Sequence, residues 1–239
     1  MPQGIEFEYD VLERPTFSYV RVNLKKGQRI QCEGGTMIYF DPALEISTKK
    51  SSKGFFKSLK RVLAGETFFM NTFEAHEDGY VGLAPPFPGD LMHIPLETNE
   101  SWILFSGCFV ASSIHFETET NFLGLKRSFF GGERAFFLQV DAIEAPGDLF
   151  IGAMGAFIEL TLGEGQIFNC DNGHLVAMES SVSFDIKKVG GLKSTFLSGE
   201  GLIVQLTGPG KIIMQSRNPR EFALWLYNFM PKPSSSGNP

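Results

Sequence analysis

The sequence is poor in the side chains that carry most covalent and metal chemistry. Of its 239 residues, three are cysteine and four are histidine. The cysteines Cys32, Cys108 and Cys170 are odd in number and include no Cys-x-x-Cys pair. This usage predicts reduced, mostly buried thiols in a cytoplasmic protein, and it argues against a disulfide framework.

Long apolar runs are also absent. No segment approaches the ~18 consecutive apolar residues that a membrane-spanning helix needs. The N-terminus, MPQGIEFEYD, lacks the basic and apolar regions of a signal peptide and is too acidic for a transit peptide. We therefore expect a soluble protein with no transmembrane segment.

An excess of positive charge is missing too. The chain has 21 basic and 27 acidic residues, a net charge of −6. Proteins that bind duplex DNA or RNA neutralise phosphates with a basic surface. We expect no nucleic-acid partner.

No catalytic motif is present. The serines form no Gly-x-Ser-x-Gly elbow, and the glycines form neither a P-loop nor a dinucleotide-binding fingerprint. His76, His93, His115 and His174 are scattered without the spacing of a metal-binding motif, and most of them lie in or beside expected strands, where a hydrogen-bonded structural role is common. We predict no cofactor, no metal site and no enzymatic activity.

Apolar residues, by contrast, are plentiful. Hydrophobic residues make up 43% of the chain, and phenylalanine is common at 24 residues, against 2 Trp and 5 Tyr. Phenylalanine adds buried area without a polar tip that needs a partner. A chain of this length and composition can form one large all-β domain or two ordinary ones.

One pattern recurs three times at a spacing of 67 residues. Loops that begin with Leu-Lys, at 59–69, 125–137 and 192–204, each reach a Gly-Glu step. These steps are Gly65-Glu66, Gly132-Glu133 and Gly199-Glu200. They are interpreted as structural markers of strand entry after a tight turn.

Other features accompany each marker. Before it come a glycine with an apolar segment (Gly35, Gly107, Gly173) and an alternating segment (44–50, 114–120, 182–188). After it come an apolar segment (67–73, 134–140, 201–207) and a Pro-Gly turn (Pro88-Gly89, Pro146-Gly147, Pro209-Gly210). Alternation with a period of two predicts strands with one solvated face, and Pro-Gly predicts type II turns. Cys108 and His174 share one position of the pattern, and Cys32 and Cys170 share another, but a tetrahedral metal site needs more local ligands.

The predicted fold is all-β, with three tandem repeats of ~67 residues that form a β-sandwich or a barrel-like solenoid. We expect a single domain over 1–217, divided at about 1–100, 101–167 and 168–217, with extra strands at 5–12 and 18–24 and an insert at 76–87. A helix is predicted over 218–230, because Asn218 is a good N-cap, Pro219 suits the first turn and Glu221 completes a capping box. Its apolar stripe either closes the end of the β stack or docks on a neighbouring subunit. Residues 231–239 are expected to be disordered.

The Leu-Lys loops are the best candidate interaction sites. The first loop mixes aromatic and basic side chains, and each later loop keeps one lysine; the candidates are Phe55, Phe56, Lys57, Lys60, Arg61, Lys126 and Lys193. Such a mixture could contact anionic lipid headgroups or phosphates, which leaves peripheral membrane contact open. In the other interpretation, the apolar members seal the end of the fold and the lysines are solvated.

The quoted segments resemble a known family. GLKSTFLSGEGLIVQLTGPG, GHLVAMESSVSFDI and LAGETFFMNTF followed by GLAPPFPGD are similar to the altered inheritance of mitochondria 24 family, over about residues 15–217. The resemblance implies a TRAP-like fold, a shortened double-stranded β-helix repeated three times, as in the tryptophan RNA-binding attenuation protein. It implies homo-oligomers, with a trimer expected. It carries over no catalytic residue, and neither RNA nor tryptophan binding.

The leading functional hypothesis is a non-enzymatic, soluble, oligomeric β scaffold or interaction protein. Side-by-side β units leave two terminal sheet edges with unpaired backbone groups, which favours association. The alternative is a binder of a small ligand or of anionic lipid through the Leu-Lys loops. A third interpretation is a cryptic hydrolase or metal-dependent enzyme.

Overall fold

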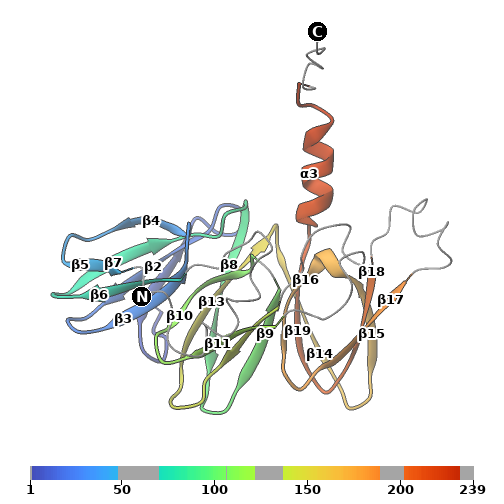
Figure 1. Ribbon diagram of the computed structural model, residues 1–239, viewed down its shortest axis with the longest axis horizontal. Helices are drawn as coiled ribbons and strands as arrows, with labels where there is room; N and C mark the ends of the chain where they lie inside the picture. Colours follow the sequence, from blue (N-terminus) through green and yellow to red (C-terminus); the bar gives the residue numbers. More distant parts are fainter. Residues whose placement is uncertain (1, 48–69, 106, 122–136, 189–201, 232–239) are drawn as a thin grey trace, which may run out of the picture.

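The computed structural model describes residues 2–47, 70–105, 107–121, 137–188 and 202–231. Within these residues the protein is mostly β-strand, arranged in antiparallel sheets, with one α-helix near the C-terminal end (Figure 1). The predicted all-β class with a C-terminal helix is confirmed. None of the four sheets formed by these residues closes into a barrel, so the barrel-like form of the prediction is wrong.

The strands form four sheets, which we number I to IV. Sheet I has the order β1 (Glu8–Leu12), β2 (Tyr19–Leu24), β7 (Gly79–Leu83), β4 (Met37–Phe40). Sheet II has the order β5 (Leu44–Ser47), β6 (Met70–Ala75), β3 (Arg29–Glu33), β10 (Phe109–Ser113), β13 (Gly147–Met154), β8 (Gly89–Leu96). Sheet III has the order β11 (Glu117–Asn121), β12 (Phe137–Asp141), β9 (Ser101–Phe105), β16 (Leu175–Glu179), β19 (Gly210–Gln215), β14 (Phe157–Leu162). Sheet IV has the order β15 (Ile167–Asp171), β18 (Leu202–Thr207), β17 (Ser183–Lys188).

Sheets II and III have the same internal order. Each strand of sheet III has a number six higher than the strand in the same place in sheet II. Each of these sheets consists of two groups of three neighbouring strands. The two groups meet where β10 pairs with β3 in sheet II and where β16 pairs with β9 in sheet III. We call these two pairings the internal joints. Strands β10 and β16 each follow a Gly-containing turn.

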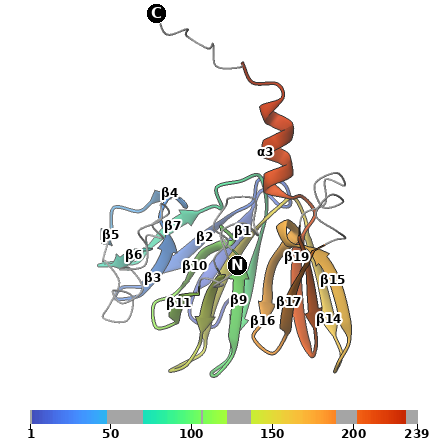
Figure 2. The same ribbon diagram turned by 45° about the vertical axis from the view of Figure 1, so that its right-hand side comes forward.

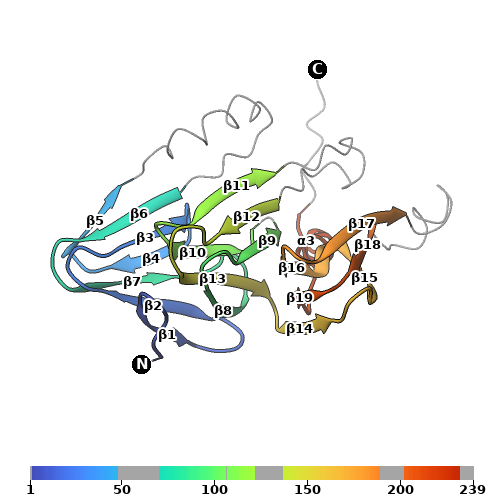
Figure 3. The same ribbon diagram turned by 90° about the horizontal axis from the view of Figure 1, so that it is seen from below.

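The sheets pack face to face in succession, with a hydrophobic core between each pair. Sheets I and II enclose a core that includes Val20, Ile30, Phe73 and Phe150. Sheets III and IV enclose another, which includes Leu162, Leu206 and Met214. Figure 3, seen from below, shows the sheets following one another along the long axis of the molecule.

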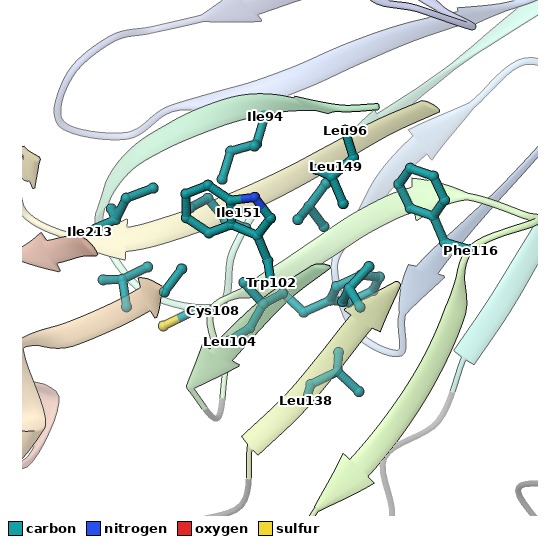
Figure 4. Close-up of a cluster of buried hydrophobic side chains, with 14 of the residues drawn as sticks. Ile94, Leu96, Trp102, Leu104, Cys108, Phe116, Leu138, Leu149, Ile151 and Ile213 are labelled. Carbon is teal, nitrogen blue, oxygen red and sulfur yellow. The ribbon is translucent and has the colours of Figure 1, made fainter. Parts of the chain in front are cut away.

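The central core lies between sheets II and III and contains Trp102, one of the two tryptophans of the sequence. Trp102 and Leu104 of β9 face Leu149 and Ile151 of β13 across this core, and Cys108 lies beside them (Figure 4). Alternation along the strands produces this burial, since every second side chain points to the same face. The predicted apolar segments 67–73, 134–140 and 201–207 likewise contribute core residues, from β6, β12 and β18.

Most predicted strands lie where the alternation placed them, with shifts at their ends. The segment 114–120 is an exception, because β11 begins only at Glu117 and Phe116 lies in the preceding turn, where it is buried. The expected insert at 76–87 contains β7, which pairs with both β2 and β4. It is therefore a strand of sheet I.

The Pro-Gly turns each lead into a strand, but the predicted type II geometry, which needs a glycine φ of about +80°, is wrong for all three. Gly210 has a positive φ of 141°, whereas Gly89 and Gly147 do not adopt positive φ. At these two positions glycine is needed for close approach: a Cβ on Gly89 would lie 1.9 Å from the carbonyl oxygen of Ala153, and one on Gly147 would lie 2.5 Å from Ser113 Oγ.

The predicted helix is present as α3 (Pro219–Tyr227), and its N-cap is Asn218. The Asn218 side chain accepts hydrogen bonds from the backbone N–H groups of Arg220, at 3.0 Å, and Glu221, at 3.5 Å. No residue of α3 is buried, and the helix projects away from the sheets (Figures 1 and 2). The interpretation that it closes the end of the β stack is wrong. Residues 232–239 lie outside the described residues.

Candidate functional site

The candidate interaction loops and the repeat markers all lie outside the described residues. The loop residues are Phe55, Phe56, Lys57, Lys60, Arg61, Lys126 and Lys193, and the markers are Gly65, Glu66, Gly132, Glu133, Gly199 and Glu200. Their roles stay predictions. The candidate sites below come from the described residues.

A buried carboxylate anchors the N-terminal segment to sheet II. Asp148, at the start of β13, is fully buried and accepts hydrogen bonds from three consecutive backbone N–H groups, those of Ile5 (2.7 Å), Glu6 (2.8 Å) and Phe7 (2.9 Å). His93 Nε2 lies 2.7 Å from the same carboxylate. Burial by itself would raise the pKa of Asp148, but the hydrogen bonds from His93 and from the backbone outweigh it and lower this pKa below its usual value.

Asp148, His93 and Tyr9 form a continuous chain of hydrogen bonds. Tyr9 Oη lies 3.0 Å from His93 Nδ1, while His93 Nε2 faces Asp148. The order of acid, imidazole and hydroxyl resembles an activated nucleophile. However, burial and then the charge of Asp148 raise the pKa of Tyr9, which keeps the phenol protonated. The geometry is therefore that of a structural anchor, in which His93 bridges the phenol of Tyr9 and the carboxylate of Asp148.

A second acidic anchor holds the segment that leads into β2. Asp90, also buried, accepts two hydrogen bonds from the Arg14 guanidinium, at 2.9 and 2.7 Å, and one from Ser18 Oγ at 2.8 Å. Burial would raise the pKa of Asp90, but these donors lower it below its usual value. Both anchors use an aspartate two residues after a proline of the Pro-Gly turns, and sequence reasoning assigned neither.

The remaining histidines have structural hydrogen-bond partners, as predicted. His115 Nε2 lies 3.1 Å from the carbonyl oxygen of Pro146, and His174 Nδ1 lies 2.8 Å from that of Gln215. His76 pairs with Glu45 on the surface. The described residues include no group of three or more His, Cys, Asp or Glu side chains arranged to hold a metal ion.

The three cysteines are free thiols. Cys32 and Cys108 are buried and Cys170 is half-buried, in agreement with the prediction. Burial raises the pKa of Cys32 to about 11 and the pKa values of Cys108 and Cys170 to about 12. Thiols with such raised pKa values are poor nucleophiles at neutral pH.

The most unusual surface is the free edge of sheet I, which we call the β4 edge. Strand β4 pairs with β7 on one side only. Three of its four side chains are large, apolar and exposed: Met37 is 38% exposed, Ile38 50% and Phe40 36%. Unpaired edge strands with apolar side chains are templates for pairing with another chain.

A second free edge lies on sheet IV, which we call the β15 edge. Strand β15 pairs with β18 on one side only. Ile167 is 58% exposed, and Phe168 and Cys170 are half-buried. The β4 edge and the β15 edge lie at opposite ends of the long axis (Figure 1).

The strands that correspond to these edges are paired inside the chain. Strand β10, which pairs with β3, is buried at every residue, and β16, which pairs with β9, is buried at four of five. Sequence reasoning expected free edges but did not locate them. A signal was available in MIYF at 37–40, where consecutive large side chains replace the smaller ones of FVAS at 109–112.

Within the described residues, no helix has both the length and the apolar character that crossing a lipid bilayer requires. The exposed apolar side chains of α3 belong to a helix of nine residues.

Two relatives from Streptococcus pyogenes resemble this chain over most of its length. An uncharacterised protein from serotype M6 is 28% identical over 227 residues, which cover 92% of this chain and 89% of that protein. The X-ray crystal structure of another S. pyogenes protein superposes with a TM-score of 0.78 at 24% identity, covering 94% of this chain and all of that one. This second likeness concerns the fold.

A family comparison agrees with the resemblance noted from the sequence. The profile described as "Mitochondrial biogenesis AIM24" matches residues 9–217, which include every strand except the first residue of β1. The match leaves out only α3 and the short segments at the two ends. On this evidence the chain belongs to the AIM24 family.

Proposed function

We propose that this protein is a non-enzymatic scaffold that assembles with copies of itself through the edges of its sheets. The observation that carries the proposal is the contrast between the two internal joints, which are buried, and the β4 and β15 edges, which expose the corresponding strands. A chain that already joins its strands in this way twice has the means to do so again with another copy.

The finer form of the proposal is a chain of three equivalent TRAP-like units. The pairings group the strands as β2–β7, β8–β13 and β14–β19, and within each group the first strand pairs with the last and the second with the fifth. The second and third units begin one strand earlier than the predicted ranges, which start at 101 and 168, because β8 and β14 belong to them. Gly35, Gly107 and Gly173 then precede corresponding strands, β4, β10 and β16.

The polar groups support a structural role. The two buried aspartates are engaged by the N-terminal segment and by Arg14, and the histidines by backbone carbonyls or carboxylates. Groups engaged in this way stabilise the fold and are not available to a substrate. Exposed apolar side chains lie on the β4 and β15 edges and on α3, and also between strands at Ile5, Phe17 and Ile143.

The proposal is tested by the mass of the purified protein in solution. We expect multi-angle light scattering to report an oligomer, with a trimer at three times the chain mass of 26.5 kDa. A head-to-tail contact produces a closed ring if the rotation that relates successive copies returns to the first copy, and an open filament if it does not. A monomer at 50 µM protein and physiological salt would overturn the proposal.

Lipid binding through the Leu-Lys loops stays a prediction of the sequence. Flotation with vesicles of phosphatidylcholine and 30% phosphatidylserine separates it from the scaffold proposal. Binding that disappears when Lys57, Lys60 and Arg61 are replaced by Gln would favour the lipid-binding alternative.

A further inference from the structure

We infer that the β4 edge of one copy pairs antiparallel with the β15 edge of a second copy, with Tyr39 opposite Cys170. The inference rests on the proposed self-assembly and adds the contact surface, the partner and the register. The two internal joints are the basis for the inference. In each of them a strand equivalent to β4, which is β10 or β16, pairs with a strand equivalent to β15, which is β3 or β9.

The two internal joints share one register. In the first joint Ala111 lies opposite Cys32, Ser112 opposite Gln31 and Ser113 opposite Ile30. In the second joint Ala177 lies opposite Leu104, Met178 opposite Ile103 and Glu179 opposite Trp102. Both joints therefore contain three consecutive antiparallel pairs that start at an alanine.

The position of that alanine in β4 is occupied by Tyr39. The register of β10 with β13 shifts between Phe109 and Ala111, and that of β16 with β19 shifts between Leu175 and Ala177. The register of β4 with β7 shifts in the same way, between Met37 and Tyr39. This irregularity aligns the three strands without ambiguity, since it occurs once in each.

The position of Cys32 and Leu104 is occupied in β15 by Cys170. Strands β3, β9 and β15 each have five residues and pair along their whole length with β6, β12 and β18, respectively. The fourth residue is Cys32 in β3, Leu104 in β9 and Cys170 in β15. Extending the shared register predicts three pairs between copies: Tyr39 with Cys170, Phe40 with Asn169 and Asp41 with Phe168.

Burial indicates how much surface the contact would cover. In the internal joints the residues at the positions of Met37, Ile38 and Phe40 are at most 2% exposed: Phe109, Val110, Ser112, Leu175, Val176 and Met178. On the β4 edge the same positions are 36–50% exposed. Pairing with β15 would remove these apolar side chains from water, which is the main favourable contribution to association.

Tyr39 is larger than the alanine at the same position of the internal joints, but it is compatible with pairing of β4 and β15. The Tyr39 ring lies over Gly82 of β7, where a Cβ would come within 2.5 Å of it. Tyr39 also makes edge-to-face contacts with Tyr19 and Tyr80. The ring therefore packs on its own sheet and leaves the backbone of β4 open toward a neighbour.

The second copy is the occupant that fits both edges. The β4 edge and the β15 edge correspond to the two halves of one joint, and they lie at opposite ends of the long axis of the molecule, so one molecule cannot pair them with each other (Figure 1). Joining the β4 edge of one copy to the β15 edge of the next continues the sheet order already seen twice. Such a heterologous contact propagates from copy to copy until it closes.

The test is a disulfide between copies at the predicted register. In the Tyr39→Cys variant, the new thiol would face the native Cys170 of the next copy, within the 4.4–6.8 Å that Cα atoms span in a disulfide. Burial raises the pKa of Cys170 to about 12, so an added oxidant, copper-phenanthroline, is used. We expect covalent dimers and higher species to dominate on non-reducing gels and to disappear with dithiothreitol.

Two matched controls isolate the register. In Phe40→Cys the thiol would lie one residue away and on the opposite face of the sheet, so at least fivefold less crosslink is expected. Tyr39→Cys combined with Cys170→Ser should form none, because Cys32 and Cys108 are buried. An equal yield from the Tyr39→Cys and Phe40→Cys variants would overturn the register.

Hydrogen exchange on the unmodified protein covers the case in which Tyr39→Cys fails to fold. Amides of β4 and β15 should exchange at least tenfold more slowly at 50 µM than in a sample diluted until light scattering reports a monomer. An oligomer whose β4 and β15 amides gain no protection would overturn this inference and leave the scaffold proposal standing. A protein that is monomeric at every concentration would overturn both.

Discussion

At the scale of the residue, the buried aspartates explain how the N-terminal segment is held. Asp148 receives three backbone N–H groups from residues more than 140 positions away in the chain. Asp90 receives Arg14 and Ser18 from more than 70 positions away. Asp148 accepts from the backbone of the buried Phe7, and Asp90 accepts from the hydroxyl of the buried Ser18. Without these carboxylates both donors would be buried without a partner, which is costly.

Replacing Asp148 by Asn should destabilise the protein strongly. The amide that replaces one carboxylate oxygen is a donor, and it would face backbone N–H donors, so we expect a loss of about 2–3 kcal/mol in the free energy of unfolding. Urea denaturation followed by tryptophan fluorescence measures the change. The control is Asp185→Asn on the exposed face of β17, which should change stability by less than about 0.5 kcal/mol. Equal effects at the two sites would contradict the anchoring role.

The same carboxylates make stability depend on pH in the acid range. The pKa values of Asp148 and Asp90 are lowered in the folded state, so both groups favour folding while they are ionised. Their contribution is complete above the ordinary carboxyl pKa of 3.8 and is lost as the pH falls below it toward the lowered values. The melting temperature should therefore drop below about pH 4, and the drop should be shallower in Asp148→Asn. Parallel curves for the two proteins would contradict this assignment.

At the scale of the element, α3 is a local structure that the β fold does not require. Its cap is strong, because Asn218 accepts from the first turn of the helix and also donates from Nδ2 to Asp171 Oδ1 at 3.0 Å. The body of the helix buries nothing against the sheets. The cap belongs to the β fold, and the helix extends from it.

Ending the chain after Asn218 should leave the fold intact. The shortened protein retains the contact between Asn218 and Asp171 but lacks the exposed side chains of α3, so its melting temperature should change by less than about 2 °C. Thermal unfolding followed by circular dichroism measures this. As a comparison, ending the chain before Met214 removes part of β19 and should prevent folding. A loss of more than about 5 °C in the first truncation would indicate that α3 packs on the β fold in solution.

At the scale of the whole molecule, the four sheets make an open series. The β4 edge lies at one end and the β15 edge at the other, and each corresponds to one half of an internal joint. The two internal joints pair strands that are far apart in sequence: β3 with β10, where Cys32 lies opposite Ala111, and β9 with β16, where Leu104 lies opposite Ala177. The proposed contact between copies repeats them. An open series of this kind favours assembly with further copies.

A pair of edge variants should complement one another. Ile38→Lys places a charge on the β4 edge, and Asn169→Lys places one on the β15 edge, where exposed lysines discourage strand pairing. Each variant alone should be monomeric by light scattering. Mixed in equal amounts they should form a species of twice the 26.5 kDa chain mass, because each has one intact edge. A mixture that remains monomeric, or variants that assemble alone, would contradict a contact of β4 with β15.

Much of the local structure was predictable from the sequence. Alternation of apolar and polar residues predicted most strands, because the period of two depends only on the residues of the strand itself. The helix start was predictable for the same reason, since Asn218, Pro219 and Glu221 act within one turn. The expected histidine roles followed from positions in or beside predicted strands; His93 lies in β8, and His115 and His174 lie between strands.

What the tertiary structure alone decided is which distant segments meet. Nothing local in the sequence of Asp148 indicates that it binds the backbone of residues 5–7. The large side chains of β4 differ from those of β10, but they do not by themselves show that β4 pairs on one side only while β10 and β16 pair on both. The sequence determined the strands, turns and cap of this protein because these depend on neighbouring residues. The anchors, joints and free edges depend on the order of strands within each sheet, which long-range packing selects.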